Sequence, residues 1–245
     1  TSPHKTNDAQ VVDAMRHGLY HLSTREAVFE HGHVLLEALK VDVGNAKKED
    51  IEQALAKTEG AEQYHRASHQ TGGKHLYHGR TIDRSVGWEV TLAEQLLDHR
   101  NVVRPLASPD KIEKTLRAHS LTNEQARAAD FVLKSRDRIV SVVGVAGAGK
   151  SHLVKTIKAA TQHRDHLAIA PTSTAAVDLG RDVGIKSQTL TGFLQTGGRD
   201  VSRNTVLFVD ESSMTSTRQA SRLMDIAKAS KSRVILIGDT KQAEA

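Results

Sequence analysis

A glycine-rich segment of eight residues, 144–151, constrains the fold more than any other part of this 245-residue sequence. It reads GVAGAGKS, follows the apolar run of residues 139–143 and precedes a helical pattern over residues 151–160. Glycines at this spacing let the backbone curl so that its N–H groups and the start of the helix face an anion. The order of strand, turn and helix therefore predicts a phosphate-binding loop, and it disfavours the alternative of a glycine-rich turn without a ligand.

The residue types in this loop suit a nucleoside triphosphate and a magnesium ion. Lys150 offers a point charge for the β and γ phosphates, and the Ser151 hydroxyl is a ligand for Mg²⁺. We therefore expect ATP and Mg²⁺ as cofactors. The backbone around the phosphates would come from Gly144, Gly147, Ala148 and Gly149.

The second half of the chain alternates between short apolar runs and segments long enough for helices. Because parallel strands are buried on both faces, such runs indicate a parallel sheet with helices on both sides. The predicted fold class is thus α/β, and the resemblance of residues 144–151 to the loop of P-loop NTPases implies a RecA-like sheet. The predicted strands are residues 139–143, 167–170, 206–209 and 234–237.

Composition excludes several other classes of protein. Apolar runs reach about six residues, whereas a membrane span needs roughly 18 to 20. No leader opens the chain, and there are no cysteines for disulfides, thiolate zinc sites or a cysteine nucleophile. We therefore expect a cytoplasmic protein without membrane insertion.

Positive charge is concentrated in the second half. Residues 121–245 hold 18 basic and 12 acidic residues, a net charge of +6, whereas residues 1–120 hold 16 and 17, a net charge of −1. An excess of this size favours an anionic partner for the second half.

The first half predicts a small, mainly α domain over residues 1–103 that resembles a winged helix. A linker is predicted over residues 104–118, where two prolines interrupt helical patterns, and the ATPase lobe over residues 119–245. The expected elements of the small domain are helices over 7–22, 34–39 and 48–56, a short strand at 27–29, a hairpin over 62–80 that turns at 72–73, and a strand or turn leading into a helix over 82–99.

Two acidic residues follow the predicted strand 206–209. Asp210 would hold Mg²⁺, directly or through water, and Glu211 could orient and deprotonate an attacking water, with a strand-end turn as the alternative. Gln242, in the pentad 238–242, could reach the γ-phosphate region, although that pentad alone is better explained as a plain β-turn. Gln125 alone would be an ordinary helix-start residue.

In this order and spacing, the segments resemble superfamily 1 helicases of the RecD-like branch over about half of the chain. The resemblance implies that Gln125 reads adenine and that Asp210, Glu211 and Gln242 serve ATP hydrolysis.

The same resemblance implies contacts with single-stranded DNA. Thr172, Ser173 and Thr174 would donate hydroxyl hydrogen bonds to the DNA backbone, with simple helix capping as the alternative. Phe193 would stack on a base, although packing in the core is the alternative that we favour.

A narrower resemblance is to the helicase region of TraI/TrwC-type conjugative relaxases. It rests on residues 144–151, on the run FVDESSM at 208–214, and on STREAVF at 23–29 with leucines that follow it. It implies part of a 5′ to 3′ single-strand DNA translocase or helicase. The implied partners are single-stranded DNA, type IV secretion or coupling proteins and the remainder of the relaxase–helicase chain.

Other parts of that family are not matched in this sequence. The relaxase tyrosines and three-histidine site have no counterpart, so DNA nicking is not expected. Motifs IV, V and VI, the second lobe and its arginine finger are also unmatched, and the finger typically contributes on the order of 10³ to 10⁵ in rate. We therefore expect nucleotide binding with weak or absent hydrolysis by this piece alone.

Other functions remain open on the sequence alone. One alternative is a recognition module for DNA or a secretion channel, with ATP as a conformational ligand. A small-molecule P-loop kinase is disfavoured by Glu211 and Gln242. Eleven of the fourteen histidines lie in the first 119 residues, and the pairs His17–His21 and His65–His69 have a spacing that can bind zinc. Solvated or hydrogen-bonded histidines are the better interpretation.

Overall fold

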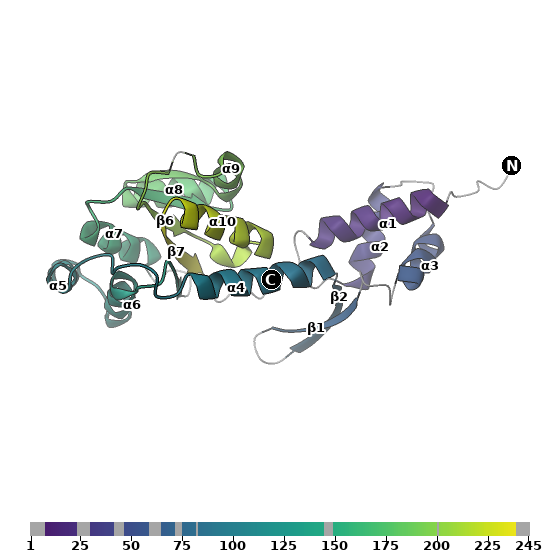
Figure 1. Cartoon of the computed structure of the whole chain (residues 1–245), viewed down its shortest axis with the longest axis horizontal. Coiled ribbons are helices and arrows are strands. Elements are labelled where there is room, and N and C mark those ends of the chain that lie inside the picture. The colour runs from purple at the N-terminus through teal and green to yellow at the C-terminus, as the bar shows by residue number, and fades with distance from the viewer. Residues whose placement is uncertain are drawn as a thin grey trace. The chain divides into compact units, whose positions relative to one another are not determined.

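The computed structural model describes eight stretches of the chain: residues 8–23, 30–41, 47–58, 65–71, 75–81, 83–144, 149–199 and 201–238. The chain divides into two compact units, which are considered separately below (Figure 1). The first comprises Thr1–Leu92 with Ser216–Arg218, and the second comprises Ala93–Thr215 with Gln219–Ala245.

The first unit contains three helices followed by an antiparallel hairpin. Its likeness to a winged helix stays a prediction. The helices are α1 (Asp8–Ser23), α2 (His31–Val41) and α3 (Lys48–Thr58), and the hairpin strands are β1 (His65–Thr71) and β2 (His75–Thr81). The predicted strand at 27–29 and the hairpin turn at 72–73 lie outside the described residues. The segment 82–99 is helical from Asp83 onward as α4 (Asp83–Asp98), so the strand or turn expected at its start is not found there.

Periodic apolar residues build the core of this unit. Gly18 of α1 lies so close to the backbone of α2 that a β-carbon would come within 2.9 Å of the Ala38 nitrogen. A larger residue would push the two helices apart. The buried core consists of Val11, Met15, Leu19, Leu22, Val34, Leu35, Ala38, Ile51, Ala54 and Leu55.

The second unit is built on a parallel sheet of five strands in the order β3-β7-β6-β4-β5. The strands are β3 (Ile139–Val143), β4 (His166–Ala170), β5 (Lys186–Thr189), β6 (Val206–Val209) and β7 (Arg233–Gly238). The α/β prediction is therefore confirmed, and four of the strands coincide closely with the predicted runs. The short edge strand β5 was not predicted, because its sequence KSQT has no apolar run.

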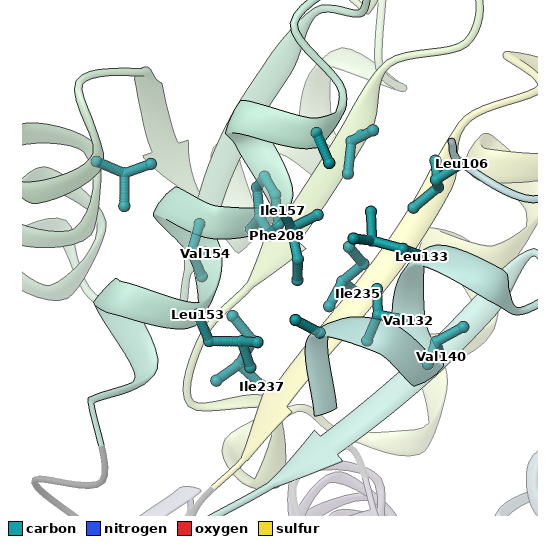
Figure 2. Close-up of a cluster of buried hydrophobic side chains, with 14 of the residues drawn as sticks. Leu106, Val132, Leu133, Val140, Leu153, Val154, Ile157, Phe208, Ile235 and Ile237 are labelled. Atoms are coloured by element: carbon teal, nitrogen blue, oxygen red, sulfur yellow. The ribbon is translucent and has the colours of Figure 1, made fainter. Parts of the chain in front are cut away.

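Helices cover both faces of the sheet. On one face, α5 (Pro109–Ala118), α6 (Asn123–Lys134), α7 (Lys150–Ala160) and α8 (Ser173–Val183) pack onto alternate strand residues such as Val140, Phe208 and Ile235. Figure 2 shows these three residues with side chains of α6 and α7, which are Val132, Leu133, Leu153, Val154 and Ile157. On the other face, α9 (Leu190–Thr196) and α10 (Thr217–Ala229) pack onto Ile169 and Leu207. None of the helices in the described stretches is long and apolar enough to cross a membrane.

The predicted linker contributes to this second unit. Ser108 caps α5 by accepting a hydrogen bond from the Lys111 N–H, and Pro109 occupies the first turn, where its missing N–H costs nothing. Leu106 and Ile112 are both 2% exposed within the core, and the Leu106 N–H donates to the Leu133 carbonyl over 2.8 Å. Residues 104–118 therefore include a packed helix.

His166, the first residue of β4, gives the fold a predictable pH dependence. Its ring stacks on Phe208, and its Nε2 lies 2.8 Å from the Thr161 hydroxyl. Burial, and then the charge of Lys158, lowers the pKa of His166 below 6.5. The unfolded chain therefore binds the proton of His166 more tightly than the folded chain does. The neutral ring contributes its full share of the free energy of unfolding above pH 6.5, and this share is lost as the pH falls from 6.5 toward the lower pKa of the folded state.

When the pH is lowered from neutral to mildly acidic, we expect the urea concentration at the midpoint of unfolding to fall. The fall should be smaller in His166→Asn. The matched control is His163→Asn, because His163 is an exposed neighbour in sequence. Equal pH slopes for His166→Asn and for the unmodified chain would contradict this assignment.

Candidate nucleotide-binding site

The sheet topology gathers the predicted site residues at the edge where the parallel strands end, here called the carboxyl edge. The Gly144 N–H donates to the Gly238 carbonyl over 3.2 Å, which joins the start of the predicted phosphate loop to the end of β7. The Asp210 N–H donates to the Ile169 carbonyl over 2.8 Å, which ties the end of β6 to β4. The ends of β3, β7, β6 and β4 therefore follow one another along this edge.

Helix α7 begins where the phosphate loop ends. Gly149 is its N-cap and has a φ of 76°, a left-handed conformation that favours glycine. Lys150 and Ser151 open the helix, so the positive end of the helix dipole and its first N–H groups point toward the carboxyl edge. Residues 145–148, which include Gly147 and Ala148, lie outside the described residues.

Gln125 lies directly against the loop. Its backbone N–H donates to the Thr122 hydroxyl over 3.2 Å, and its side-chain oxygen accepts from the Thr122 N–H over 3.1 Å, a reciprocal cap for α6. The space that a β-carbon at Gly149 would occupy holds the Gln125 amide nitrogen. The helix-start role of Gln125 is therefore confirmed, and its amide lies beside Gly149 at the end of the predicted phosphate loop. Adenine reading stays a prediction.

Asp210 and Glu211 follow β6 with an unusual backbone. The half-buried Asp210 accepts the Glu211 N–H on its Oδ1 over 2.9 Å. Glu211 has a φ of 49° and a ψ of 37°, a left-handed conformation that costs a residue with a β-carbon roughly 1 kcal/mol or more. Strain of this kind clusters at functional sites. Sequence analysis missed it, because glutamate carries no signal for this conformation.

Two further predicted features lie at or beyond the end of β7. Gly238 approaches the short helix η1 (Ser212–Met214), and a β-carbon there would lie 3.4 Å from the Ser212 hydroxyl. Gln242 belongs to residues 239–245, which the structure does not describe, so its role stays a prediction.

The donor set fits a magnesium nucleotide. The Ser151 hydroxyl and the Asp210 carboxylate are hard oxygen ligands of the kind that Mg²⁺ prefers. Backbone N–H groups at the start of α7, together with the Lys150 ammonium, suit phosphate oxygens. The arrangement can thus bind a triphosphate and its metal along one edge of the sheet.

The predicted DNA contacts divide into two groups. Thr172 caps α8 by accepting the Ala175 N–H over 3.2 Å, which confirms the capping alternative for this residue. Thr172, Ser173 and Thr174 are all exposed, so hydroxyl contacts with DNA stay a prediction. Phe193, a residue of α9, is in contrast 0% exposed and belongs to the core. A base cannot stack on a buried ring, and the stacking role is therefore corrected to core packing.

The histidines show ordinary contacts where the structure describes them. The His17 and His21 rings stack with centroids 6.5 Å apart, and His21 Nδ1 lies 3.1 Å from a Glu37 carboxylate oxygen. Over the described residues, no group of three His, Cys, Asp or Glu side chains could hold a metal ion. The side chains of His65 and His69 lie outside the described part.

Comparison with known proteins gives one matching family and several relatives that are named for conjugation. A family model described as an AAA domain matches residues 120–245. The conjugal transfer protein TraA of Rhizobium radiobacter is 29% identical over 161 residues, which are 64% of this chain and 15% of that protein. The multifunctional conjugation protein TraI of Escherichia coli strain K12 is 27% identical over 170 residues, 64% of this chain and 10% of that protein.

A probable conjugal transfer protein TraA of Sinorhizobium fredii is 27% identical over 138 residues, 54% of this chain and 12% of that protein. The chain thus spans between 10% and 15% of the length of these relatives.

Proposed function

Because this chain belongs to the AAA domain family, we propose that it is the ATP-binding part of a 5′ to 3′ single-strand DNA translocase or helicase of a conjugative relaxase. ATP hydrolysis is coupled to DNA movement in the intact protein. The observation that carries this proposal is the single edge of the sheet that holds Gly149, Lys150, Asp210 and Glu211.

Nucleotide binding uses the start of α7 and the end of β6. Lys150 and the first N–H groups of α7 hold the phosphates, and the Gln125 amide beside Gly149 contacts the base. Ser151 and Asp210 hold Mg²⁺, which neutralises negative charge on the phosphates.

Hydrolysis depends on Glu211 and Gln242. The Glu211 carboxylate orients the attacking water and accepts its proton, and the left-handed backbone fixes the direction in which this side chain leaves the strand. Gln242 contacts the γ-phosphate region. The capped conformation of Asp210, which accepts the Glu211 N–H, holds the two carboxylates in a defined relation.

Coupling to DNA runs through neighbouring strands. Strand β4 pairs with β6 in the register Ile169 to Val209, and α8 begins three residues after β4. A movement of Asp210 on nucleotide binding therefore reaches the exposed hydroxyls of Thr172, Ser173 and Thr174, which contact the DNA backbone. The partners are single-stranded DNA, the remainder of the relaxase–helicase chain, and type IV secretion or coupling proteins in the cytoplasm.

Titration of a labelled oligonucleotide with and without a non-hydrolysable ATP analogue tests this function. A motor lobe should show nucleotide-dependent DNA affinity, with a change between about 5-fold and 150-fold. The intact protein should also hydrolyse ATP faster when single-stranded DNA is present, whereas this chain alone should hydrolyse ATP weakly or not at all. Glu211→Gln should retain analogue binding and lose the hydrolysis that DNA stimulates, while the control Glu113→Gln on the exposed face of α5 should keep both.

Two outcomes would contradict the motor. An oligonucleotide affinity that is the same with and without the ATP analogue would show that DNA binding and nucleotide binding are not coupled. Coupled binding without any DNA-stimulated hydrolysis by the intact protein would instead favour the recognition module, in which ATP acts as a conformational ligand.

A further inference from the structure

Basic residues gather at the opposite edge of the sheet, where the parallel strands begin, here called the amino edge. Arg136 and Arg138 directly precede β3, Lys231 and Arg233 lie at the start of β7, and Arg164 lies two residues before β4. Because β3, β7, β6 and β4 are consecutive in the sheet, these positions follow one another across it.

Printed contacts tie further basic residues to the same edge. The Arg233 guanidinium donates to the Arg104 carbonyl over 3.0 Å and to the Ser135 carbonyl over 3.2 Å. The Arg164 guanidinium donates over 3.2 Å to the carbonyl of Asn204, which directly follows Arg203. The segments 99–104 and 202–205 are therefore fixed beside the starts of the strands.

Three of these arginines lack an internal counter-ion. Arg138, Arg164 and Arg233, here called the arginine triad, donate to backbone carbonyls, and each has a buried Nε without a hydrogen-bond partner. In the described part of the chain, no carboxylate oxygen lies within 4.0 Å of their guanidinium nitrogens.

The triad nevertheless keeps its charge at neutral pH. Burial, followed by the nearby charges of Arg164 and Arg138, lowers the pKa of Arg233 to about 10. The charge of Asp137 opposes this shift and compensates the positive charge only in part. Positive charge that is partly removed from water raises the potential over the surface above it.

The surface of the amino edge is itself basic. Five exposed residues, here called the amino-edge strip, form no ion pair within the described stretches: Arg100, Arg104, Arg136, Arg203 and Lys231. The acidic residues in the same described segments are Asp137 and Asp165. The Asp137 carboxylate accepts a hydrogen bond from the Asn101 N–H, and the Asp165 carboxylate accepts one from the Ser202 hydroxyl. The strip and the triad therefore give this edge a strongly positive balance.

The spacing and the type of these basic residues suit a ligand with several phosphate groups in a row. Three inter-strand spacings of about 4.8 Å separate β3 from β4, so the starts of these strands lie about 14 Å apart. All but one of the eight basic residues are arginine, whose planar guanidinium pairs with phosphate oxygens through two hydrogen bonds. We propose that the amino edge is a second contact surface for the sugar-phosphate backbone of single-stranded nucleic acid, separate from the contact at the start of α8.

The test neutralises two residues of the strip and leaves the buried triad intact. In Arg136→Gln/Lys231→Gln, binding of fluorescein-labelled oligothymidylate should weaken about tenfold at low salt, equally with and without an ATP analogue. The slope of log affinity against log salt should become shallower by about 1.4, since each lost phosphate contact accounts for about 0.7 on a single strand. A mixed-sequence oligonucleotide should behave in the same way.

The control Lys111→Gln/Arg117→Gln removes the same charge from α5. A similar loss in this control, or unchanged binding in the strip variant with unaltered thermal unfolding, would overturn the proposal. The proposal would also be overturned if the strip variant lost binding of polyglutamate but kept binding of the oligonucleotide. That result would make an acidic protein the partner of the strip. The variant Ser173→Ala/Thr174→Ala separates the two surfaces, because it should reduce only the nucleotide-dependent part of DNA binding.

Discussion

Replacement of Lys150 with alanine should weaken binding of the magnesium–ATP complex by about 100-fold, because charge-assisted hydrogen bonds contribute roughly 1.5 to 3 kcal/mol each. Lys150 opens α7 directly after the left-handed Gly149, so its ammonium group would approach the phosphates of a bound nucleotide together with the helix N–H groups. Titration with a fluorescent ATP analogue measures the loss. DNA binding in the absence of nucleotide should be unchanged.

The matched control is Lys155→Ala, which removes an exposed charge from the same helix. Its ATP affinity should stay within a factor of about two, since exposed charges far from a ligand contribute little. If Lys150→Ala bound the analogue as tightly as the unmodified chain, the nucleotide site would have to lie elsewhere.

Replacement of Phe193 with alanine should lower the free energy of unfolding by about 3 to 5 kcal/mol, the usual cost of removing a fully buried aromatic ring. The ring is among the largest fully buried side chains and lies in a cluster with Ile169 and Leu223. Urea unfolding measures the change. Phe131→Ala is the control, because that ring is 59% exposed and its removal should cost within about 0.5 kcal/mol.

A second variant separates core packing from base stacking. Phe193→Leu keeps most of the buried volume but removes the aromatic face, so it should leave oligonucleotide affinity unchanged. A clear loss of DNA affinity in Phe193→Leu, with stability retained, would restore the stacking role that burial argues against.

The parts of the fold that depend on local pattern could be predicted from the sequence. Apolar runs located β3, β4, β6 and β7, because parallel strands covered on both faces have near-continuous apolar sequences. The residues 144–151 located the loop between β3 and α7. The resemblance to TraI-type conjugation proteins is confirmed by the TraA and TraI relatives.

The parts that depend on long-range contacts could not be predicted. Strand β5 is polar and is recognised only by its pairing with β4, and the predicted linker proved to contain α5 because Leu106 and Ile112 reach a core made by distant strands. Glutamate gives no sign of the left-handed backbone at Glu211. The amino edge is assembled from five separate segments, so no local pattern reveals its charge.

The strand order has a consequence for how the chain folds. Strand β7 is the latest of the described strands in the sequence, yet it lies between β3 and β6, and β3 pairs with no other described strand. Early during synthesis β3 has no neighbour to pair with, and contacts of such large sequence separation form slowly. Until β7 inserts, two apolar strand edges are open to other chains, so chaperone binding or aggregation of the nascent protein should be concentrated before residue 233 emerges from the ribosome.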